Sequence, residues 1–253
     1  MTIGAQMYTL RTFTQNTRDF SETMARVAKM GYQTVQLSAI GPMPPKDVKQ
    51  IADDNGLKIV LTHTAEARIL NDIDQVIEDH KIFDCEYVGL GAMSERYRES
   101  NWADRFVDDF MAPMEKMRDA GMLFMYHNHA FEFQRMRDGR RLIDILMTIP
   151  ADLMGITLDM YWLQFAGCDV HKWTQKLKDR IHCVHLKDMT IAMFQNRFAP
   201  IGDGNMEYKD IIAMLDRIGT TKHMLVEQDD CYGADPFECM KRSCDFVLPL
   251  LNK

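Results

Sequence analysis

The sequence predicts a (β/α)8 TIM barrel, formed as a single domain over residues 1–253. Short apolar runs rich in β-branched residues recur eight times, and each is followed by a longer segment with helical periodicity. Successive runs lie about 25 to 40 residues apart, which is the length of one strand, one helix and two short loops. The chain has the length of one such barrel, and no G-x-G-x-x-G follows the first run, which excludes the dinucleotide-binding form of a doubly wound sheet.

The predicted elements follow one another in a regular order. The strands are centred on Ala5, Val35, Ile59, Val88, Phe124, Ile156, Cys183 and Leu225. The first helix opens at Thr17 and ends at Gly31, and the second opens at Pro44-Pro45 and ends near Gly56. Later helices begin at Asp169, Tyr208 and the pair Asp235-Pro236, where a capping side chain or an early proline is the typical N-terminal signal.

Composition limits the partners. Hydrophobic residues make up 46% and charged residues 26% of the chain, as in soluble globular proteins, and no apolar run reaches the length of a membrane span. The net charge of -7 argues against nucleic acid and against an anionic membrane surface. The N-terminus does not read as a signal peptide, and the six cysteines form no C-x-x-C pair. We therefore expect a cytoplasmic protein with reduced thiols that acts on a small molecule.

Polar residues begin where the predicted strands end. Asp159, His185 and Glu227 each follow directly on an apolar strand, and His127 and His129 end the strand before them. Taken singly, the Asp is typical of a helix cap, the His of a hydrogen-bonded core residue and the Glu of a solvated side chain. Because the strand ends of a barrel share one mouth, the joint pattern predicts an oxygen and nitrogen site for Mn²⁺, Mg²⁺, Co²⁺, Fe²⁺ or Zn²⁺.

Several motifs over essentially the whole chain are those of one known family. They are Tyr126–Phe133 (YHNHAFEF), Leu158–Trp162 (LDMYW), Ala166–Asp169 (AGCD), Val184–Asp188 (VHLKD), Ile201–Asn205 (IGDGN) and Val226–Asp229 (VEQD). In these segments the chain resembles the sugar phosphate isomerase/epimerase family, which has the xylose isomerase-like barrel, and in particular its branch with the Y-H-N-H-x-F-E-F signature. The motifs are specific for the superfamily but not for a substrate.

The resemblance implies one divalent ion, for which we expect Mn²⁺, held in the pattern Glu, Asp, His, Glu. Asp159, His185 and Glu227 match three of these positions. Many relatives carry Glu-Asn-His at the end of the fifth strand, whereas this chain has His127 at the position of that Glu. The fourth ligand is therefore either His127 or Glu132, and we favour Glu132 because a third carboxylate better neutralises a hard cation.

Such a site would activate a carbonyl and a neighbouring hydroxyl of a sugar, keto-sugar or polyol toward an enediolate. Glu227 and Glu132 are the expected acid and base, with His129 and His63 as alternatives. Lys187 lies two residues after His185, so we expect it to face the same side and to neutralise an oxyanion or bind a phosphate. Its alternative role is a salt bridge with Asp188 or Glu227.

Other residues are candidates for substrate contact. Arg11 and Arg197 are expected to bind an anionic substituent, and His63 and His127 to contact the substrate directly. Trp162, with its neighbour Tyr161, is expected to form a stacking wall for a sugar ring, with plain packing as the alternative. Ketose 3-epimerases carry a histidine at the position of Trp162, which argues against that activity. Two glycines, Gly89 and Gly91, are expected to leave space for a ligand, and the long loop containing residues 202–204 to form a lid.

The function expected from these residues is a metal-dependent isomerase or epimerase. A keto-sugar or keto-inositol dehydratase or lyase, including one that cleaves keto-glycosides, would use the same residues. An apurinic-site endonuclease of the endonuclease IV type is disfavoured by the acidic charge and the single ligand set, and a non-catalytic sugar-binding barrel by the conjunction of the ligand residues. Barrels of the resembled family are often dimers or tetramers, so a homo-oligomer is possible.

Overall fold

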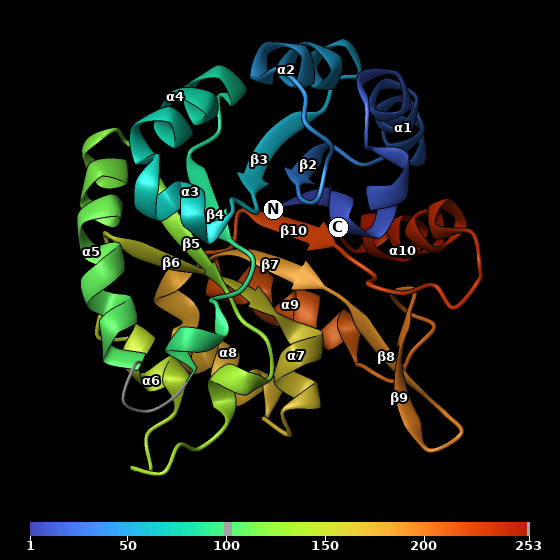
Figure 1. Ribbon diagram of the computed structural model, residues 1–253. Coiled ribbons are helices and arrows are strands. Elements are labelled where there is room, and N and C mark those ends of the chain that lie inside the picture. The colour runs from blue at the N-terminus through green and yellow to red at the C-terminus, as the bar shows by residue number, and fades with distance from the viewer. Residues whose placement is uncertain (99–102, 252–253) are drawn as a thin grey trace.

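In the computed structural model, which describes residues 1–98 and 103–251, eight parallel strands form a nearly closed barrel surrounded by helices (Figure 1). The strand order is β3-β2-β1-β10-β7-β6-β5-β4, and every described ladder between these strands is parallel. This confirms the predicted fold class and the position of all eight predicted strands.

The barrel strands are short and almost entirely buried. They are β1 (Thr2–Gln6), β2 (Thr34–Leu37), β3 (Lys58–Thr62), β4 (Tyr87–Leu90), β5 (Leu123–His127), β6 (Met154–Asp159), β7 (Ile181–Leu186) and β10 (His223–Val226). One face of each strand packs against helices and the other fills the barrel interior, where Met125, Cys183 and Leu225 belong to one apolar cluster. Because both faces are buried, the strands read as continuous apolar runs rather than as alternating patterns.

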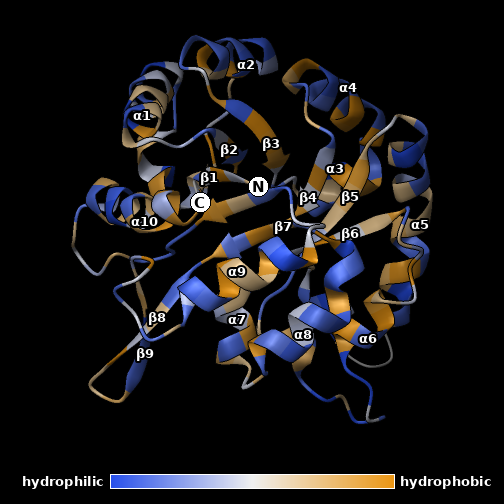
Figure 2. Ribbon diagram, turned by 180° about the vertical axis from the view of Figure 1, so that it is seen from behind, coloured by the Kyte–Doolittle hydropathy of each residue, from blue (hydrophilic) through white to orange (hydrophobic). Residues whose placement is uncertain are grey.

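Helices follow the strands around the outside of the barrel. They are α1 (Thr17–Met30), α2 (Pro45–Asp54), α3 (Glu66–Asn71), α4 (Ile73–Phe83), α5 (Ala103–Asp119), α6 (Leu142–Leu146), α7 (Met160–Phe165), α8 (Val170–Leu177), α9 (Tyr208–Ile218) and α10 (Pro236–Leu251). Short 3-10 turns cover Met7–Phe13, Glu95–Tyr97, Phe131–Phe133 and Lys178–Arg180. Figure 2 shows their hydrophobic and hydrophilic sides. Within the described part of the chain, no helix is long and apolar enough to cross a membrane.

Helix α1 illustrates how local sequence sets the element ends. The side chain of Asn16 accepts a hydrogen bond from the backbone N–H of Asp19, so the cap is Asn16, one residue before the predicted start. At the other end Gly31 adopts φ 106°, the left-handed conformation that a residue with a side chain rarely takes. The predicted end at Gly31 is confirmed.

Strands β3 and β4 stand at the two ends of the strand order, where the barrel closes. The backbone N–H of Thr64, just beyond β3, donates to the carbonyl of Gly89 at 2.7 Å. A Cβ atom on Gly89 would lie 2.2 Å from the carbonyl oxygen of Thr62. The expectation that Gly89 leaves space for a ligand is therefore wrong, because the backbone of β3 fills that space.

The long interval before the last strand contains a β-hairpin rather than an irregular lid. Strands β8 (Asp188–Ala192) and β9 (Gln195–Ala199) pair antiparallel and project from the barrel (Figure 1). The following segment is held by the side chain of Asp188, which accepts hydrogen bonds from the backbone N–H groups of Gly202, Gly204 and Met206. Within the long loop expected to form a lid, residues 202–204 are therefore fixed to Asp188 at the start of β8.

Candidate active site

The polar residues predicted from the strand ends meet at the carboxyl end of the barrel. His127 and Asp159 end β5 and β6, His185 lies one residue before the end of β7, and Glu227 directly follows β10. Asp159 and His185 are opposite one another in the ladder between β6 and β7. The register of the sheet therefore places residues side by side that are 26 positions or more apart in the chain.

Four of these residues form one compact group. Each of His127, Asp159, His185 and Glu227 is buried and offers one nitrogen or oxygen atom, and these atoms lie within 4.8 Å of one another. The fourth member is His127, and Glu132 lies outside the group. The geometry therefore favours His127 over Glu132 as the fourth candidate ligand, opposite to the preference based on charge.

Glu132 is directed into the protein interior instead. Its Oε1 accepts a hydrogen bond from the hydroxyl of Tyr126 at 2.7 Å, and its Oε2 accepts one from the backbone N–H of His129 at 2.8 Å. The side chain is completely buried, and burial raises its pKa to about 7. Glu132 thus supports the backbone at His129 and does not line the mouth.

Both histidines of the group are oriented through their second ring nitrogen. Nδ1 of His127 lies 2.8 Å from the carbonyl oxygen of Gly91, and Nε2 of His185 lies 2.7 Å from Oε1 of Gln36. Each of these oxygens accepts a hydrogen bond, so it holds a proton on the nearer nitrogen. The other nitrogen of each ring faces the centre of the group with its lone pair available when the ring is neutral.

The two carboxylates divide their oxygens in the same way. Oδ1 of Asp159 accepts the backbone N–H of Trp162 at 3.0 Å and caps α7, while Oδ2 faces the group. Oε1 of Glu227 accepts a hydrogen bond from Nε2 of Gln6 at 2.7 Å, while Oε2 faces the group. Asp159 therefore has both roles considered from the sequence. Its Oδ1 caps a helix, and its Oδ2 belongs to the group.

Lys187 occupies the centre of the charge cluster. Its side chain is 1% exposed, and Nζ lies 3.1 Å from Oδ2 of Asp159, 2.9 Å from Oε2 of Glu227 and 3.0 Å from Oδ1 of Asp229. Burial alone would lower the pKa of Lys187, but these carboxylates outweigh it and raise the pKa well above the ordinary value. Of the two salt bridges considered from the sequence, the one with Glu227 forms, whereas Asp188 binds backbone N–H groups instead.

Protonation in the cluster follows from burial and from the neighbouring charges. Burial opposes the ionised forms of Asp159 and Glu227, but Lys187 and the histidines lower the pKa of both. Burial and the neighbouring histidines lower the pKa of His127 and His63, and that of His129 to about 3. Burial also lowers the pKa of His185, but Glu227 and Asp159 reverse this effect and raise it.

The chemistry of this group fits a divalent cation. Two imidazole nitrogens and two carboxylate oxygens form a donor set that suits Mn²⁺, Mg²⁺, Fe²⁺, Co²⁺ or Zn²⁺. Nδ1 of His185 is buried without a well-aligned hydrogen bond, although it lies 3.0 Å from Oε2 of Glu227, an oxygen that also contacts Nζ of Lys187 at 2.9 Å. The two carboxylates would balance the charge of the ion, and binding would displace a proton from His185.

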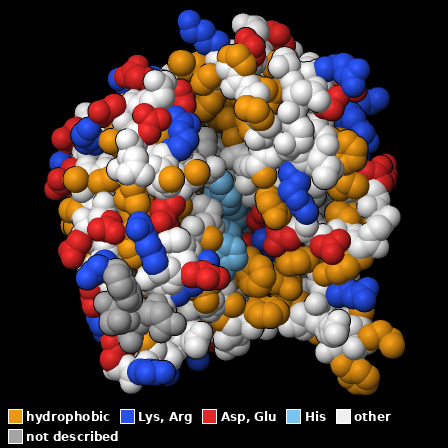
Figure 3. Space-filling model, in the orientation of Figure 1, with side chains coloured by type: hydrophobic (Ala, Val, Ile, Leu, Met, Phe, Trp, Pro, Cys, Tyr) orange, Lys and Arg blue, Asp and Glu red, His pale blue; other side chains and the backbone are white. Residues whose placement is uncertain are grey.

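Next to the group the mouth opens into a cavity of about 320 Å³. It is lined by Tyr8, Ser38, Ala39, His63, Gly91, Ala92, His127, His129, Lys187, Glu227 and Asp229. Histidine side chains are visible in the hollow of this face in Figure 3. Nε2 of His63 and Nδ1 of His129 are buried and lack a hydrogen-bond partner within the described structure. Both expected substrate-contacting histidines, His63 and His127, thus line the cavity.

The two arginines expected to bind an anionic group do not line this cavity. The guanidinium of Arg11 donates to the carbonyl oxygens of Tyr8 at 2.7 Å and Asp229 at 3.3 Å. Arg197 lies on the hairpin, 4.8 Å from the ring of Tyr232. The expectation for Arg11 and Arg197 is not supported, because Arg11 is engaged by the backbone carbonyls of two lining residues and Arg197 lies against a ring outside the cavity.

Trp162 lies beside the cavity rather than among its lining residues. Its ring is 5.3 Å from that of His129, and its indole Nε1 is buried without a partner in the described structure. Tyr161 packs against Phe198 of the hairpin at 4.6 Å. Tyr161 thus matches the packing alternative, whereas Trp162 remains a candidate neighbour of a bound ring.

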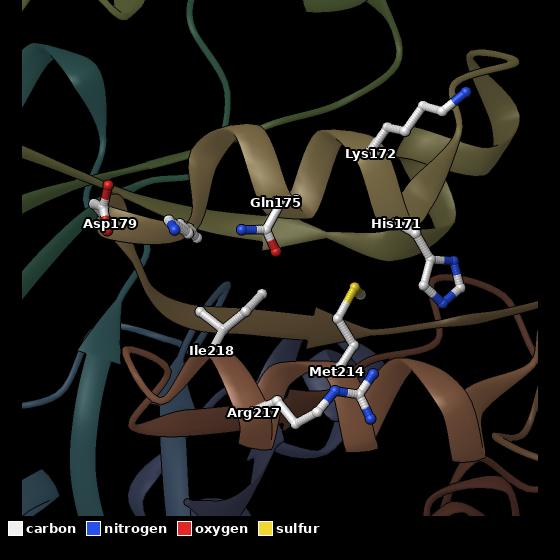
Figure 4. A pocket seen from close by; sticks show the side chains of 8 residues that line it. His171, Lys172, Gln175, Asp179, Met214, Arg217 and Ile218 are labelled. Carbon is white, nitrogen blue, oxygen red and sulfur yellow. The ribbon is translucent and has the colours of Figure 1, made fainter.

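A second cavity, of about 540 Å³, lies between α8 and α9 on the outside of the barrel (Figure 4). His171 and Gln175 on α8 and Arg217 on α9 line it, and all three are exposed. Because these side chains are exposed to solvent, nothing in their surroundings within the described structure orients them toward a ligand. The buried and mutually oriented groups at the mouth make that cavity the better candidate for an active site.

Three residues of the site were assigned no role from the sequence. Gln6 and Gln36 orient Glu227 and His185, and Asp229 binds Lys187 and lines the cavity. A glutamine within an otherwise apolar barrel strand is the signal that could have identified the first two, because a buried amide needs a polar partner. Asp229 follows Glu227 by two residues and therefore points to the same side of the chain.

The sequence profile of the xylose isomerase-like TIM barrel family matches residues 24–247. The chain belongs to this family. No curated protein matches the chain at a significant level. Among solved structures of the same fold, a sugar phosphate isomerase/epimerase from Parabacteroides distasonis ATCC 8503 is 22% identical, with a TM-score of 0.82 over 98% of each chain.

Two further structures show the range of proteins with this family's fold. A xylose isomerase-like TIM barrel protein from Mycobacterium smegmatis, in complex with magnesium, is 14% identical with a TM-score of 0.78, covering 99% of this chain and 96% of its own. An L-ribulose 3-epimerase is also 14% identical, with a TM-score of 0.74 and coverage of 99% and 94%. At these identities the likeness establishes the shared fold.

Proposed function

We propose that the protein is a metal-dependent isomerase or epimerase of a sugar, keto-sugar or polyol. The observation that carries the proposal is the buried group His127, Asp159, His185 and Glu227, in which each side chain directs one ligand atom into the mouth. The family also includes a relative of the same fold with bound magnesium. The adjoining cavity of about 320 Å³ suits a ligand of monosaccharide size.

The four grouped residues would hold the ion, for which Mn²⁺ remains our expectation. A bound divalent ion supplies Lewis-acid chemistry, which lowers the pKa of the C–H bond next to a substrate carbonyl. The chain supplies proton transfer to and from that carbon. His63 and His129 line the cavity with unpaired nitrogens and low pKa values, so both are available as neutral proton acceptors.

Lys187 is the residue best placed to stabilise negative charge on a substrate oxygen, because it is a buried ammonium in the cavity wall. Glu227 belongs to the ligand group and also lines the cavity, so it is a second candidate for proton transfer. Glu132, which we considered as an acid or base from the sequence, is assigned a supporting role because both of its oxygens bind groups outside the cavity.

The proposal is tested by metal content and by carbon–hydrogen exchange. We expect about one divalent ion per chain and metal-dependent incorporation of solvent deuterium into a member of a ketose and keto-inositol panel. Asp159→Asn should lose the ion and reduce exchange at least 100-fold, because it removes a charged ligand but retains an acceptor for the cap of α7. His171→Ala, which changes an exposed histidine of the outer cavity, is the control.

The absence of both ion and exchange from the wild-type protein would contradict the proposal. Mass analysis of the exchanged substrate separates the reaction branches. Unchanged mass apart from deuterium supports isomerisation or epimerisation, whereas loss of water or of a glycosyl group would assign the alternative dehydratase or lyase reaction.

A further inference from the structure

Few charged side chains reach the cavity at the mouth. Among the described residues that line it, the cation is Lys187 and the carboxyl groups are those of Glu227 and Asp229. Burial and the nearby Glu227 raise the pKa of Asp229 to about 7, so Asp229 carries its full negative charge above that pH. Asp159 lies directly behind, in contact with Lys187 at 3.1 Å. A substrate entering this cavity therefore meets more negative than positive charge from the protein itself.

The one lysine is already neutralised. Nζ of Lys187 contacts three carboxylates at 2.9 to 3.1 Å, so a phosphate would have to compete with Asp159, Glu227 and Asp229 for the same ammonium. The nearest arginine that we considered, Arg11, donates to two backbone carbonyls and lies 4.1 Å from the centroid of the Tyr8 ring. A phosphate or carboxylate would therefore have to displace carboxylates from Lys187 or backbone carbonyls from Arg11.

Backbone groups that often bind anions in barrels are occupied as well. The loops after the seventh and eighth barrel strands commonly form a phosphate site from backbone N–H groups. In this chain Gly202, Gly204 and Met206 direct such N–H groups at Asp188, at 2.9 to 3.2 Å. A Cβ on Gly204 would lie 2.3 Å from Oδ1 of Asp188, so the carboxylate fills the space in which a phosphate would sit.

The N-terminus of α7 is occupied in the same way. Oδ1 of Asp159 accepts the N–H of Trp162, so this helix end at the mouth is capped by a carboxylate of the protein.

The overall charge balance of the site also argues against an anionic substrate. A divalent ion would offset Asp159 and Glu227, and Lys187 would offset Asp229, which leaves no net positive charge for an anion.

What the cavity does offer is uncharged hydrogen-bonding groups. Nε2 of His63 and Nδ1 of His129 are buried and unpaired in the described structure, and the side chains of Ser38 and Tyr8 lie in the same wall. These groups match the hydroxyl and carbonyl oxygens of a sugar. We propose that the mouth selects uncharged polyhydroxylated carbonyl compounds and rejects their phosphorylated or carboxylated counterparts. This inference rests on the proposed function and specifies its substrate class.

The test compares matched pairs of ligands on the purified, metal-loaded protein and on the metal-free protein. D-fructose with D-fructose 6-phosphate and D-ribulose with D-ribulose 5-phosphate are suitable probes. Binding is measured by saturation-transfer NMR, and deuterium incorporation is measured in parallel. We expect the uncharged member of a pair to bind at least ten times more tightly, and the preference to persist without metal.

Asp229→Asn removes one negative charge from the cavity wall when it is compared with the wild type at pH 8, where Asp229 is ionised. Removing this carboxylate frees Lys187 from one of its three partners, so the preference for the uncharged member should fall at least fivefold. Asp230→Asn removes the same charge from the neighbouring exposed residue, which binds the backbone N–H of Tyr232, and should leave the preference intact. Equal effects of the two variants would contradict a local role for Asp229.

The outcomes separate the two proposals. Equal or tighter binding of the phosphate ester, with deuterium exchange present, would overturn the substrate class and leave the proposed reaction standing. A preference for the uncharged ligand without exchange on any panel member would support the substrate class and contradict the proposed reaction. If neither ligand of any pair binds, the substrate class fails, and metal content and exchange on the wider panel decide the proposed reaction.

Discussion

Each residue of the candidate ligand group uses one polar atom inside the protein and directs another toward the common centre. Gln36 and Gly91 orient the imidazoles, while Gln6 and the N-terminus of α7 hold the carboxylates. Groups held in this way lose little conformational entropy when a ligand binds, because the protein has already fixed their rotamers. The preorganisation is the residue-scale basis of the proposed chemistry.

The buried carboxyl of Glu132 leads to a prediction about pH. Its pKa is raised to about 7 by burial, so the folded protein holds this proton over a range in which the unfolded chain has lost it. The contribution of Glu132 to stability should therefore fall as pH rises from about 4.5 to about 7, by on the order of 3 kcal/mol at most, so stability should fall less, or rise more, with pH in Glu132→Gln than in the wild type. Chemical denaturation of the wild type and of Glu132→Gln across this range measures the difference in slope.

The readout is the pH slope and not the absolute stability, because Glu132→Gln also changes the hydrogen bonds to Tyr126 and to the backbone of His129. Glu115→Gln, at an exposed position of α5, serves as the control and should keep the wild-type slope. If Glu132→Gln keeps the wild-type slope too, the raised pKa is contradicted.

At the scale of elements, the β8–β9 hairpin departs from the usual turn chemistry. Met193 and Phe194 at its tip adopt φ values of 51° and 65°, in the left-handed region that favours glycine and asparagine. Both side chains are exposed, and the backbone conformation is costly for residues of this size. The tip therefore combines backbone strain with exposed apolar surface.

Replacing the tip with the residues that this turn prefers should relieve that strain. The double variant Met193→Asn/Phe194→Gly should stabilise the protein by about 1 kcal/mol, measured by chemical denaturation. Ile191→Thr removes exposed apolar surface from β8 without altering the turn, and should change stability by less than about half as much. Destabilisation by the double variant would show that the apolar tip has a stabilising contact in solution.

At the scale of the whole molecule, the barrel has a seam between β3 and β4. These strands stand at the ends of the strand order, and they approach closely where Gly89 meets the carbonyl of Thr62. By contrast, β7 has a ladder partner on each side, β6 and β10. Opening of the barrel should therefore begin at the seam, where the fewest backbone hydrogen bonds must break.

Hydrogen exchange followed by mass spectrometry tests this expectation. Peptides covering residues 58–64 and 87–91 should exchange faster than those covering 181–186. Gly89→Ala should increase exchange at the seam further and destabilise the protein by on the order of 2 kcal/mol, because the added Cβ would lie 2.2 Å from the carbonyl of Thr62. Uniform exchange of all three regions in the wild type would argue against a weaker seam.

Much of this architecture could be predicted from local patterns. Apolar runs, capping residues and glycines act over a few positions, so they predicted eight strands, the ends of α1 and the clustering of Asp159, His185 and Glu227. The hairpin was missed because its sequence, with Met193 and Phe194 at the turn, lacks the usual turn residues. The anchoring of residues 202–204 was missed because the partner of Gly202 and Gly204 is Asp188, the first residue of β8.

The sequence alone determined the barrel and which residue types reach its mouth, since a strand end is a local feature and the barrel gathers all such ends at one face. The tertiary structure decided how their atoms are used. It placed His127 rather than Glu132 in the ligand group and engaged Arg11 with the backbone carbonyls of Tyr8 and Asp229. It also surrounded Lys187 with three carboxylates. These outcomes depend on side-chain direction across strands that are distant in the chain, which no local pattern records.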